Sequence, residues 1–140
     1  MERETGITAL SPFFDNGKKI ASGYKSKRDQ VKIWDVESGK PIKTLSDDKV
    51  EDNQVQYMAA TSDGKILATR HTLGRAKIWD TASGKIVKES EPSPGLWGNL
   101  LFLPDNKTIA FGGGEPGEKA DKIYLVNIES GKATYRSSLT

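Results

Sequence analysis

The chain has 140 residues, of which 35% are hydrophobic and 29% charged, as is typical of a globular protein with a wet surface and one domain. The absence of cysteine excludes disulfides and thiolate metal sites, and a net charge of +2 gives little support for binding to nucleic acid or to an anionic membrane. No stretch approaches the roughly 18 apolar residues of a membrane span, and the first residues lack a signal-peptide pattern, so we expect a cytoplasmic location.

The first third of the chain, residues 6–48, reads as four short strands. An apolar stretch at 6–11 precedes the turn Asp15–Lys18, whose Asn-Gly pair can supply the positive φ angles of a tight hairpin. Further strands are predicted at 19–23, 31–35 and 41–45. The short links between them allow antiparallel hairpins but not the long crossovers of a parallel sheet.

The same order of signals returns twice, in residues 54–91 and 96–140. The Ser-Gly-Lys triplets that begin at Ser38, Ser83 and Ser130 are 45 and 47 residues apart. A period in the forties is typical of stacked supersecondary units. The strands expected in the second and third units cover 55–61, 65–69, 76–80, 85–89, 97–103, 108–112, 123–127 and 132–136.

The third strand of each unit carries the strongest packing signal. Ile33 is followed by Trp34, and Ile78 by Trp79. Because neighbouring residues of a strand point to opposite faces, both faces of such a sheet are apolar. We therefore expect each four-stranded sheet to be sandwiched between others like it.

These repeats resemble the WD-repeat β-propeller family, through Trp34-Asp35, Trp79-Asp80 and the Asp-Gly-Lys and Ser-Gly-Lys turns, over about residues 6 to 140. The resemblance implies an all-β fold of three four-stranded antiparallel propeller blades, a half or partial β-propeller. The blades would cover about residues 6–48, 54–91 and 96–140 of a single domain.

The resemblance also implies a structural core for each repeat. In the family, a buried hydrogen-bonded set links the Trp to a Ser or Thr on the second strand, here Ser22 and Thr69, and to a His. No unit has that His, and the third unit has Phe111 and Val126-Asn127 at the other positions. Cohesion should then depend on packing between blades. The structural core residues expected are Ser22, Ile33, Trp34, Asp35, Thr69, Ile78, Trp79 and Asp80.

Three blades are too few for a closed ring, which typically holds about 4–8. The first and last blades would each leave an apolar face open. We predict that a second copy joins head to tail twice, so that a homodimer holds 3 + 3 blades. The alternative is that the chain is a fragment of a longer propeller, with a purely structural role.

Three stretches contain residues that could support catalysis or ligand binding. Gly112–Gly117 matches a dinucleotide-binding loop and nearly a P-loop, but Glu118 replaces the lysine and the next strand, near Lys122, leaves no room for a helix. The single histidine, His71, gives little support for a catalytic triad. The acidic stretch at 46–53 lacks the ligand spacing of a calcium-binding loop. We therefore predict no enzyme activity, no cofactor and no metal.

The loops that do not repeat are the better candidates for recognition. We predict a non-catalytic interaction or assembly scaffold that binds an unknown protein or peptide, with nucleic-acid binding through the basic loops a less favoured alternative. No membrane contact is expected. The predicted partner surface comprises Tyr24, Lys25, Lys27, Arg28, Asp47, Asp48, Glu51, Arg70, His71 and Arg75.

Overall fold

A computed structural model describes residues 7–26, 31–46, 53–71, 76–89, 100–113 and 122–137. These residues form twelve β-strands, all paired antiparallel, and they contain no helix. Within the described ranges, no helix could cross a membrane. The predicted all-β class is confirmed.

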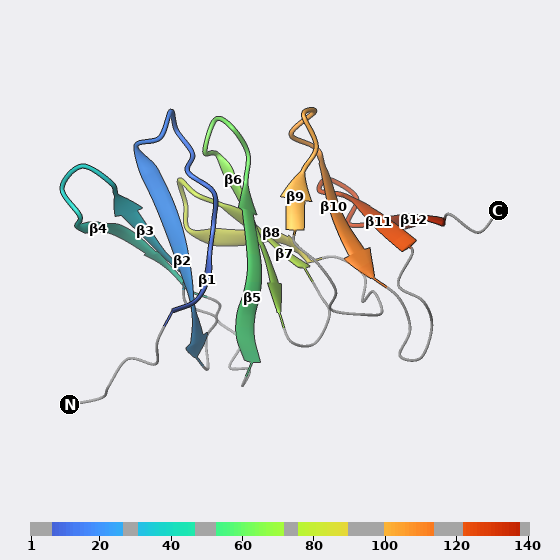
Figure 1. Cartoon of the computed structure of the whole chain (residues 1–140), viewed down its shortest axis with the longest axis horizontal. Coiled ribbons are helices and arrows are strands. Elements are labelled where there is room, and N and C mark those ends of the chain that lie inside the picture. The colour runs from blue at the N-terminus through green and yellow to red at the C-terminus, as the bar shows by residue number, and fades with distance from the viewer. Residues whose placement is uncertain are drawn as a thin grey trace.

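The strands are grouped into three four-stranded blades that lie side by side (Figure 1). Blade one holds β1 (Ile7–Leu10), β2 (Lys19–Ser26), β3 (Val31–Asp35) and β4 (Pro41–Leu45). Blade two holds β5 (Asn53–Ala60), β6 (Ile66–His71), β7 (Ala76–Asp80) and β8 (Lys85–Glu89). Blade three holds β9 (Leu100–Phe102), β10 (Thr108–Gly113), β11 (Lys122–Asn127) and β12 (Ala133–Ser137).

The first hairpin of each blade turns through residues with positive φ, as the sequence predicts. Asn16 and Gly17 have φ angles of 56° and 77°, Gly64 has 72°, and Asn106 has 55°. Glycine and asparagine adopt this backbone region at the least steric cost. The local sequence therefore fixes where each hairpin reverses.

Blades one and two share a backbone connection that the repeat pattern does not predict. β2 runs on to Ser26, beyond the predicted end at Gly23, and pairs with β5 through Lys25–Gln54 and Ser26–Asn53. The first eight strands thus form one continuous sheet, whereas blade three is a separate sheet.

Two hydrophobic cores lie between the blades. Ile33 and Leu45 of blade one pack with Leu67 and Trp79 of blade two in the first core. On its other face, blade two presents Ala68 and Ile78 to Leu100, Ile109 and Val126 of blade three in the second core. Blade two is therefore buried on both faces, as the adjacent apolar residues of β7 predict.

Trp34, an expected structural core residue, is less buried than Ile33. Ile33 is buried against blade two, whereas Trp34 is only half-buried. Its counterpart Trp79 is fully buried because blade one covers it. The described chain has no blade on the Trp34 side, so the same residue type has a different environment.

Candidate partner-binding surfaces

Most of the predicted partner surface falls outside the described residues. Lys27, Arg28, Arg75, Asp47, Asp48 and Glu51 all lie there. Lys25 and His71 are placed by their backbones alone: Lys25 pairs with Gln54, and His71 with Val55. Both are therefore strand residues and not loop residues, because β2 and β6 are longer than the sequence predicts.

Arg70 requires a correction, since it is not a surface residue. It is fully buried between blades two and three, with its guanidinium carbon 4.1 Å from the centre of the Phe111 ring. Burial lowers the pKa of Arg70, and the charges of Tyr57 and Tyr124 act in the opposite direction. Arg70 faces blade three because strand alternation places it on the same side of β6 as Ala68.

Tyr24 also lies inside the protein, which corrects the second exposed position predicted from the sequence. Its side chain is buried, and its hydroxyl accepts a 3.2 Å hydrogen bond from Ser22 Oγ. The ammonium of Lys32 lies 5.2 Å from the ring centre. Tyr24 therefore supports blade one and does not offer a free aromatic ring to a partner.

The structural core predicted for the repeats forms as two tryptophan contacts. Trp79 Nε1 donates a 2.9 Å hydrogen bond to Thr69 Oγ1, and Trp34 Nε1 donates a 2.8 Å bond to Ser22 Oγ. In blade three, Val126 at the Trp position is fully buried, while Phe111 at the Ser or Thr position stacks on Tyr124 with ring centres 5.6 Å apart. Aromatic packing replaces the polar contact there.

The Asp of each Trp-Asp pair holds the turn that follows it. Asp35 Oδ2 accepts from the Ser38 N–H at 2.8 Å, and Asp80 Oδ2 from the Ser83 N–H at 3.0 Å. Hydrogen bonding by the serine hydroxyl first, and by the serine N–H next, lowers the pKa of both carboxyl groups. In blade three, Asn127 Oδ1 accepts from the Ser130 N–H at 3.0 Å and plays the same part without a charge.

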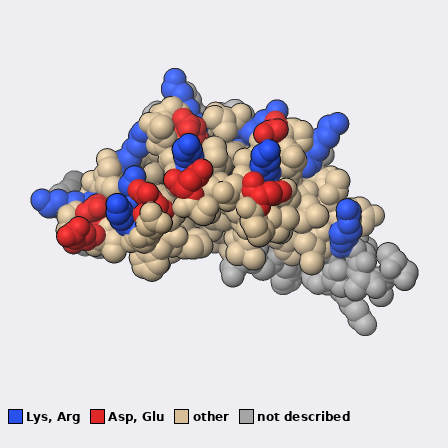
Figure 2. All heavy atoms as spheres, turned by 90° about the horizontal axis from the view of Figure 1, so that it is seen from above, with Lys and Arg blue, Asp and Glu red and all other residues tan. Residues whose placement is uncertain are grey.

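The surface formed by the hairpin turns carries both signs of charge. The turns between β1 and β2, β5 and β6, and β9 and β10 lie on one side of the molecule (Figure 1). Seen from that side, Lys and Arg are interspersed with Asp and Glu (Figure 2). Lys19 and Asp15 approach to 3.4 Å. Such mixed, exposed charges mainly keep a surface hydrated.

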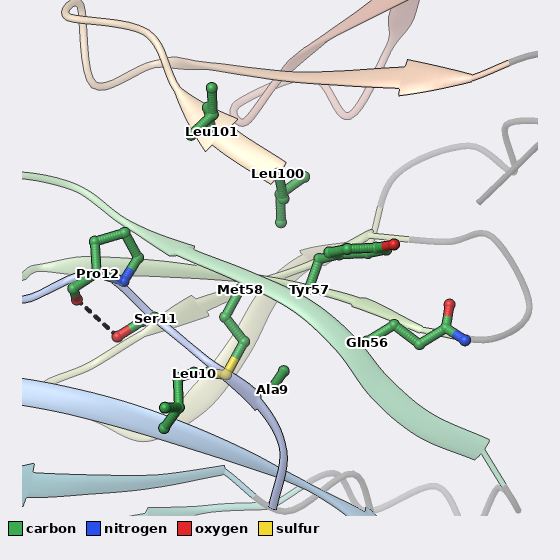
Figure 3. Close-up of a pocket in the computed structure, with 9 residues that line it drawn as sticks. All are labelled: Ala9, Leu10, Ser11, Pro12, Gln56, Tyr57, Met58, Leu100 and Leu101. Carbon is green, nitrogen blue, oxygen red and sulfur yellow. Dashed lines mark hydrogen bonds between the residues drawn. The ribbon is translucent and has the colours of Figure 1, made fainter. Parts of the chain in front are cut away.

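A hollow of about 340 Å³ lies where the first strands of the three blades meet. Polar and apolar atoms contribute about equally to its lining. Leu100 of β9 points toward Tyr57 of β5, while Met58 points the other way, toward β1 (Figure 3). Ser11, Gln56 and Tyr57 contribute the hydrogen-bonding side chains of the lining, and Gln56 Oε1 is buried without a partner among the described residues. The sequence does not predict this hollow, because its lining residues come from segments far apart in the chain.

Each end of the three-blade array presents a sheet face that no described blade covers. The blade-one end face lies on the side of Trp34 and includes Ile7, Leu10 and Ile20. Ile7 pairs with Tyr24, Leu10 with Ser22 and Ile20 with Trp34, and residues that pair in this way project from the same face of a sheet. The blade-three end face lies on the side away from Phe111 and Val126. It comprises Leu101, Ala110, Gly112, Ile123 and Leu125. Ile7, Leu10, Leu101 and Ile123 are each more than half exposed.

In the part of the chain that the structure describes, no group of three or more His, Cys, Asp or Glu side chains is arranged to hold a metal ion.

Known proteins share part of the sequence and most of the fold of this chain. No family model matches the chain. It is 29% identical to human angio-associated migratory cell protein over 77 residues, and 30% identical to human and mouse pre-mRNA-processing factor 17 over 86 residues. These matches cover 55% of the chain but only 17% and 13% of the relatives, so the chain corresponds to a small part of their length.

Solved structures match over more of the chain. The structure of U3-55K superposes with a TM-score of 0.76 at 18% identity, over 99% of this chain and 41% of the other. The crystal structure of the RRP9 WD40 repeats gives a TM-score of 0.74 at 19% identity, over 96% and 39%. Together with the repeat signature, these likenesses confirm the resemblance to the WD-repeat β-propeller family, of whose fold this chain builds three blades.

Proposed function

We propose that the protein is a non-catalytic interaction scaffold whose two end faces bind further propeller blades. One observation carries this: residues that are buried between blades inside the array recur, exposed, at its two ends. Leu10 is 58% exposed, although its counterparts Met58 and Leu100 are 4% and 2% exposed. Contiguous exposed apolar surface of this kind marks an interaction site.

The proposed partner is a second copy of the chain, which would supply three further blades. The alternative is the remainder of a longer propeller, since one array covers 41% of the U3-55K chain. Light scattering on the purified chain separates the two. We expect twice the 15.3 kDa mass of one chain. A monomer at all concentrations would contradict self-association and favour the longer propeller.

A second proposal concerns the loops between blades and between the second and third strands of a blade. Lys27, Arg28 and Arg75 are basic, and Asp47, Asp48 and Glu51 are acidic, a mixture suited to a protein or peptide partner. We expect alanine at the three basic positions to reduce the proteins captured in a pull-down. Alanine at Lys65 and Lys107, in the hairpin turns, is the matched control. An unchanged capture profile would contradict the site.

A further inference from the structure

The contact between blades one and two shows how one blade seats on the next. Gly23 of β2 lies on the blade-one face that meets blade two. A Cβ atom at Gly23 would lie 2.6 Å from Val55 Cγ1 and 3.2 Å from Met58 Sδ. Real Cβ atoms do not approach other carbons so closely, so two aliphatic side chains of β5 occupy a socket that glycine leaves open.

The blade-three end face has a glycine at the corresponding position, Gly112, so we expect a second socket of this kind there. Gly112 pairs with Ile123 just as Gly23 pairs with Val31. Each glycine also comes directly after the residue at the Ser or Thr position of the repeat, which is Ser22 in blade one and Phe111 in blade three. Strand alternation places Gly112 on the side opposite the buried Phe111.

The neighbours of the two glycines also correspond. Around Gly23, the face toward blade two consists of Ala21, Val31 and Ile33, all buried. Around Gly112, the paired positions hold Ala110, Ile123 and Leu125. Ile123 is 53% exposed, whereas its counterpart Val31 is fully buried. The apolar positions of the two faces correspond, but no described blade covers those of blade three.

The blade-one end face carries the side chains that would fill this socket. Ile7 and Leu10 pair with Tyr24 and Ser22, as Val55 and Met58 pair with His71 and Thr69. The pairing slips by one residue at the same point in both hairpins, between Ile7 and Ala9 and between Val55 and Tyr57. Ile7 and Leu10 therefore project from blade one as Val55 and Met58 project from blade two.

We propose that, in a second copy, Ile7 and Leu10 seat over Gly112 of the first, so that the contact between copies repeats the contact between blades one and two. This inference rests on the self-association proposed above and specifies its interface. One position departs from the match: Arg136 pairs with Ile123 where Leu45 pairs with Val31, so the outer end of the interface is polar. Because the contact joins two different faces, it closes into a ring or continues as a filament.

Cysteine cross-linking tests the contact directly, because the natural chain contains no cysteine. One protein carries Ile7→Cys and a second carries Gly112→Cys, and the two are mixed under mild oxidation. Ile7 is chosen because the Cβ atom of its counterpart Val55 lies 2.7 Å from the Cβ position of Gly23. A disulfide requires Cα atoms about 4.4–6.8 Å apart, so it reports close neighbours and little else. Val87→Cys, on the outer strand of blade two and 55% exposed, replaces Ile7→Cys in the control mixture.

We expect the Ile7 and Gly112 pair to give a covalent dimer at least about tenfold faster than the control pair. Gly112→Leu, which fills the socket, is expected to weaken self-association by at least about tenfold while the melting curve of the monomer is retained. A dimer mass without preferential cross-linking would overturn this interface but leave self-association standing. A monomer mass would overturn both.

Discussion

Trp79 donates its indole N–H to the hydroxyl of Thr69 at 2.9 Å, and both side chains are fully buried. The equivalent pair in blade one, Trp34 and Ser22, makes a 2.8 Å bond, but Trp34 is only half-buried. The two bonds are alike in geometry and differ in solvent access. A lost partner costs most where water cannot replace it.

Thr69→Val should therefore lower the free energy of unfolding by about 1–3 kcal/mol, because it leaves the Trp79 N–H buried and unpaired. Ser22→Ala is the comparison variant, although it also removes the hydrogen bond from Ser22 to the Tyr24 hydroxyl. We expect a smaller loss from it, because Trp34 is only half-buried and water can reach its N–H. Urea unfolding followed by tryptophan fluorescence measures both. Equal losses would contradict the assigned difference in burial.

Arg70 should be needed for the contact between blades two and three. Arg70→Ala removes a fully buried side chain that lies on the Phe111 ring, and we expect a loss of about 2 kcal/mol or more in the free energy of unfolding. Arg136→Ala, at an exposed position, should change stability by less than about 0.5 kcal/mol.

A double-mutant cycle isolates the ring contact. Combining Arg70→Ala with Phe111→Leu should reveal a coupling energy of about 0.5–2 kcal/mol. Strictly additive losses would show that Arg70 acts through other neighbours.

The turn aspartates should make the fold sensitive to acid. The pKa values of Asp35 and Asp80 are lowered below 3.8 by hydrogen bonds from Ser38 and Ser83, so the folded state binds protons more weakly than the unfolded state. The stability that these carboxylates contribute is fully present above the unfolded-state pKa of 3.8, and it is lost as the pH falls through the lower pKa values of the folded state.

Asn127 shows that an uncharged side chain can hold the same turn. The double variant Asp35→Asn and Asp80→Asn should thus keep its stability near neutral pH. As the pH falls below about 4, it should lose less stability than the natural chain. Asp63 and Asp105 also have lowered pKa values and are unchanged in the variant, so part of the loss of stability in acid should remain. Thermal unfolding at a series of pH values below about 5 measures the difference, and parallel curves for variant and natural chain would refute the assignment.

The two socket glycines should respond differently to the same substitution. Gly23→Ala forces a methyl group against Val55 and should cost about 1–3 kcal/mol in the free energy of unfolding. Gly112→Ala, on an uncovered face, should leave the monomer at least as stable, because alanine restricts the unfolded chain. Calorimetry on dilute protein tests this pair, and equal destabilisation would contradict the open placement of Gly112.

How far the sequence predicts the structure depends on whether the signal is local. The positive φ values at Gly17 and Gly64 follow from the turn residues, and the burial of both faces of blade two follows from Ile78 and Trp79. Trp34 has the same local sequence as Trp79 but a different burial, because burial depends on which blade lies opposite.

The predicted surface position of Arg70 is wrong for a related reason. Its basic neighbours predict a loop, yet β6 continues through His71, and the aromatic side chain that covers Arg70 comes from Phe111, in another blade. The pairing between β2 and β5 depends equally on contacts across the repeat. The sequence could indicate these features only if the strands were first placed in space.

The pairing of Lys25 with Gln54 and of Ser26 with Asn53 has a consequence for how the array comes apart. Blades one and two share backbone hydrogen bonds, so separating them breaks a sheet, whereas blade three is a sheet of its own, held to blade two by side-chain packing. The weakest joint in the array thus lies between β5–β8 and β9–β12. Blade three can open as an independent cooperative unit and expose the second core, while the first eight strands remain intact.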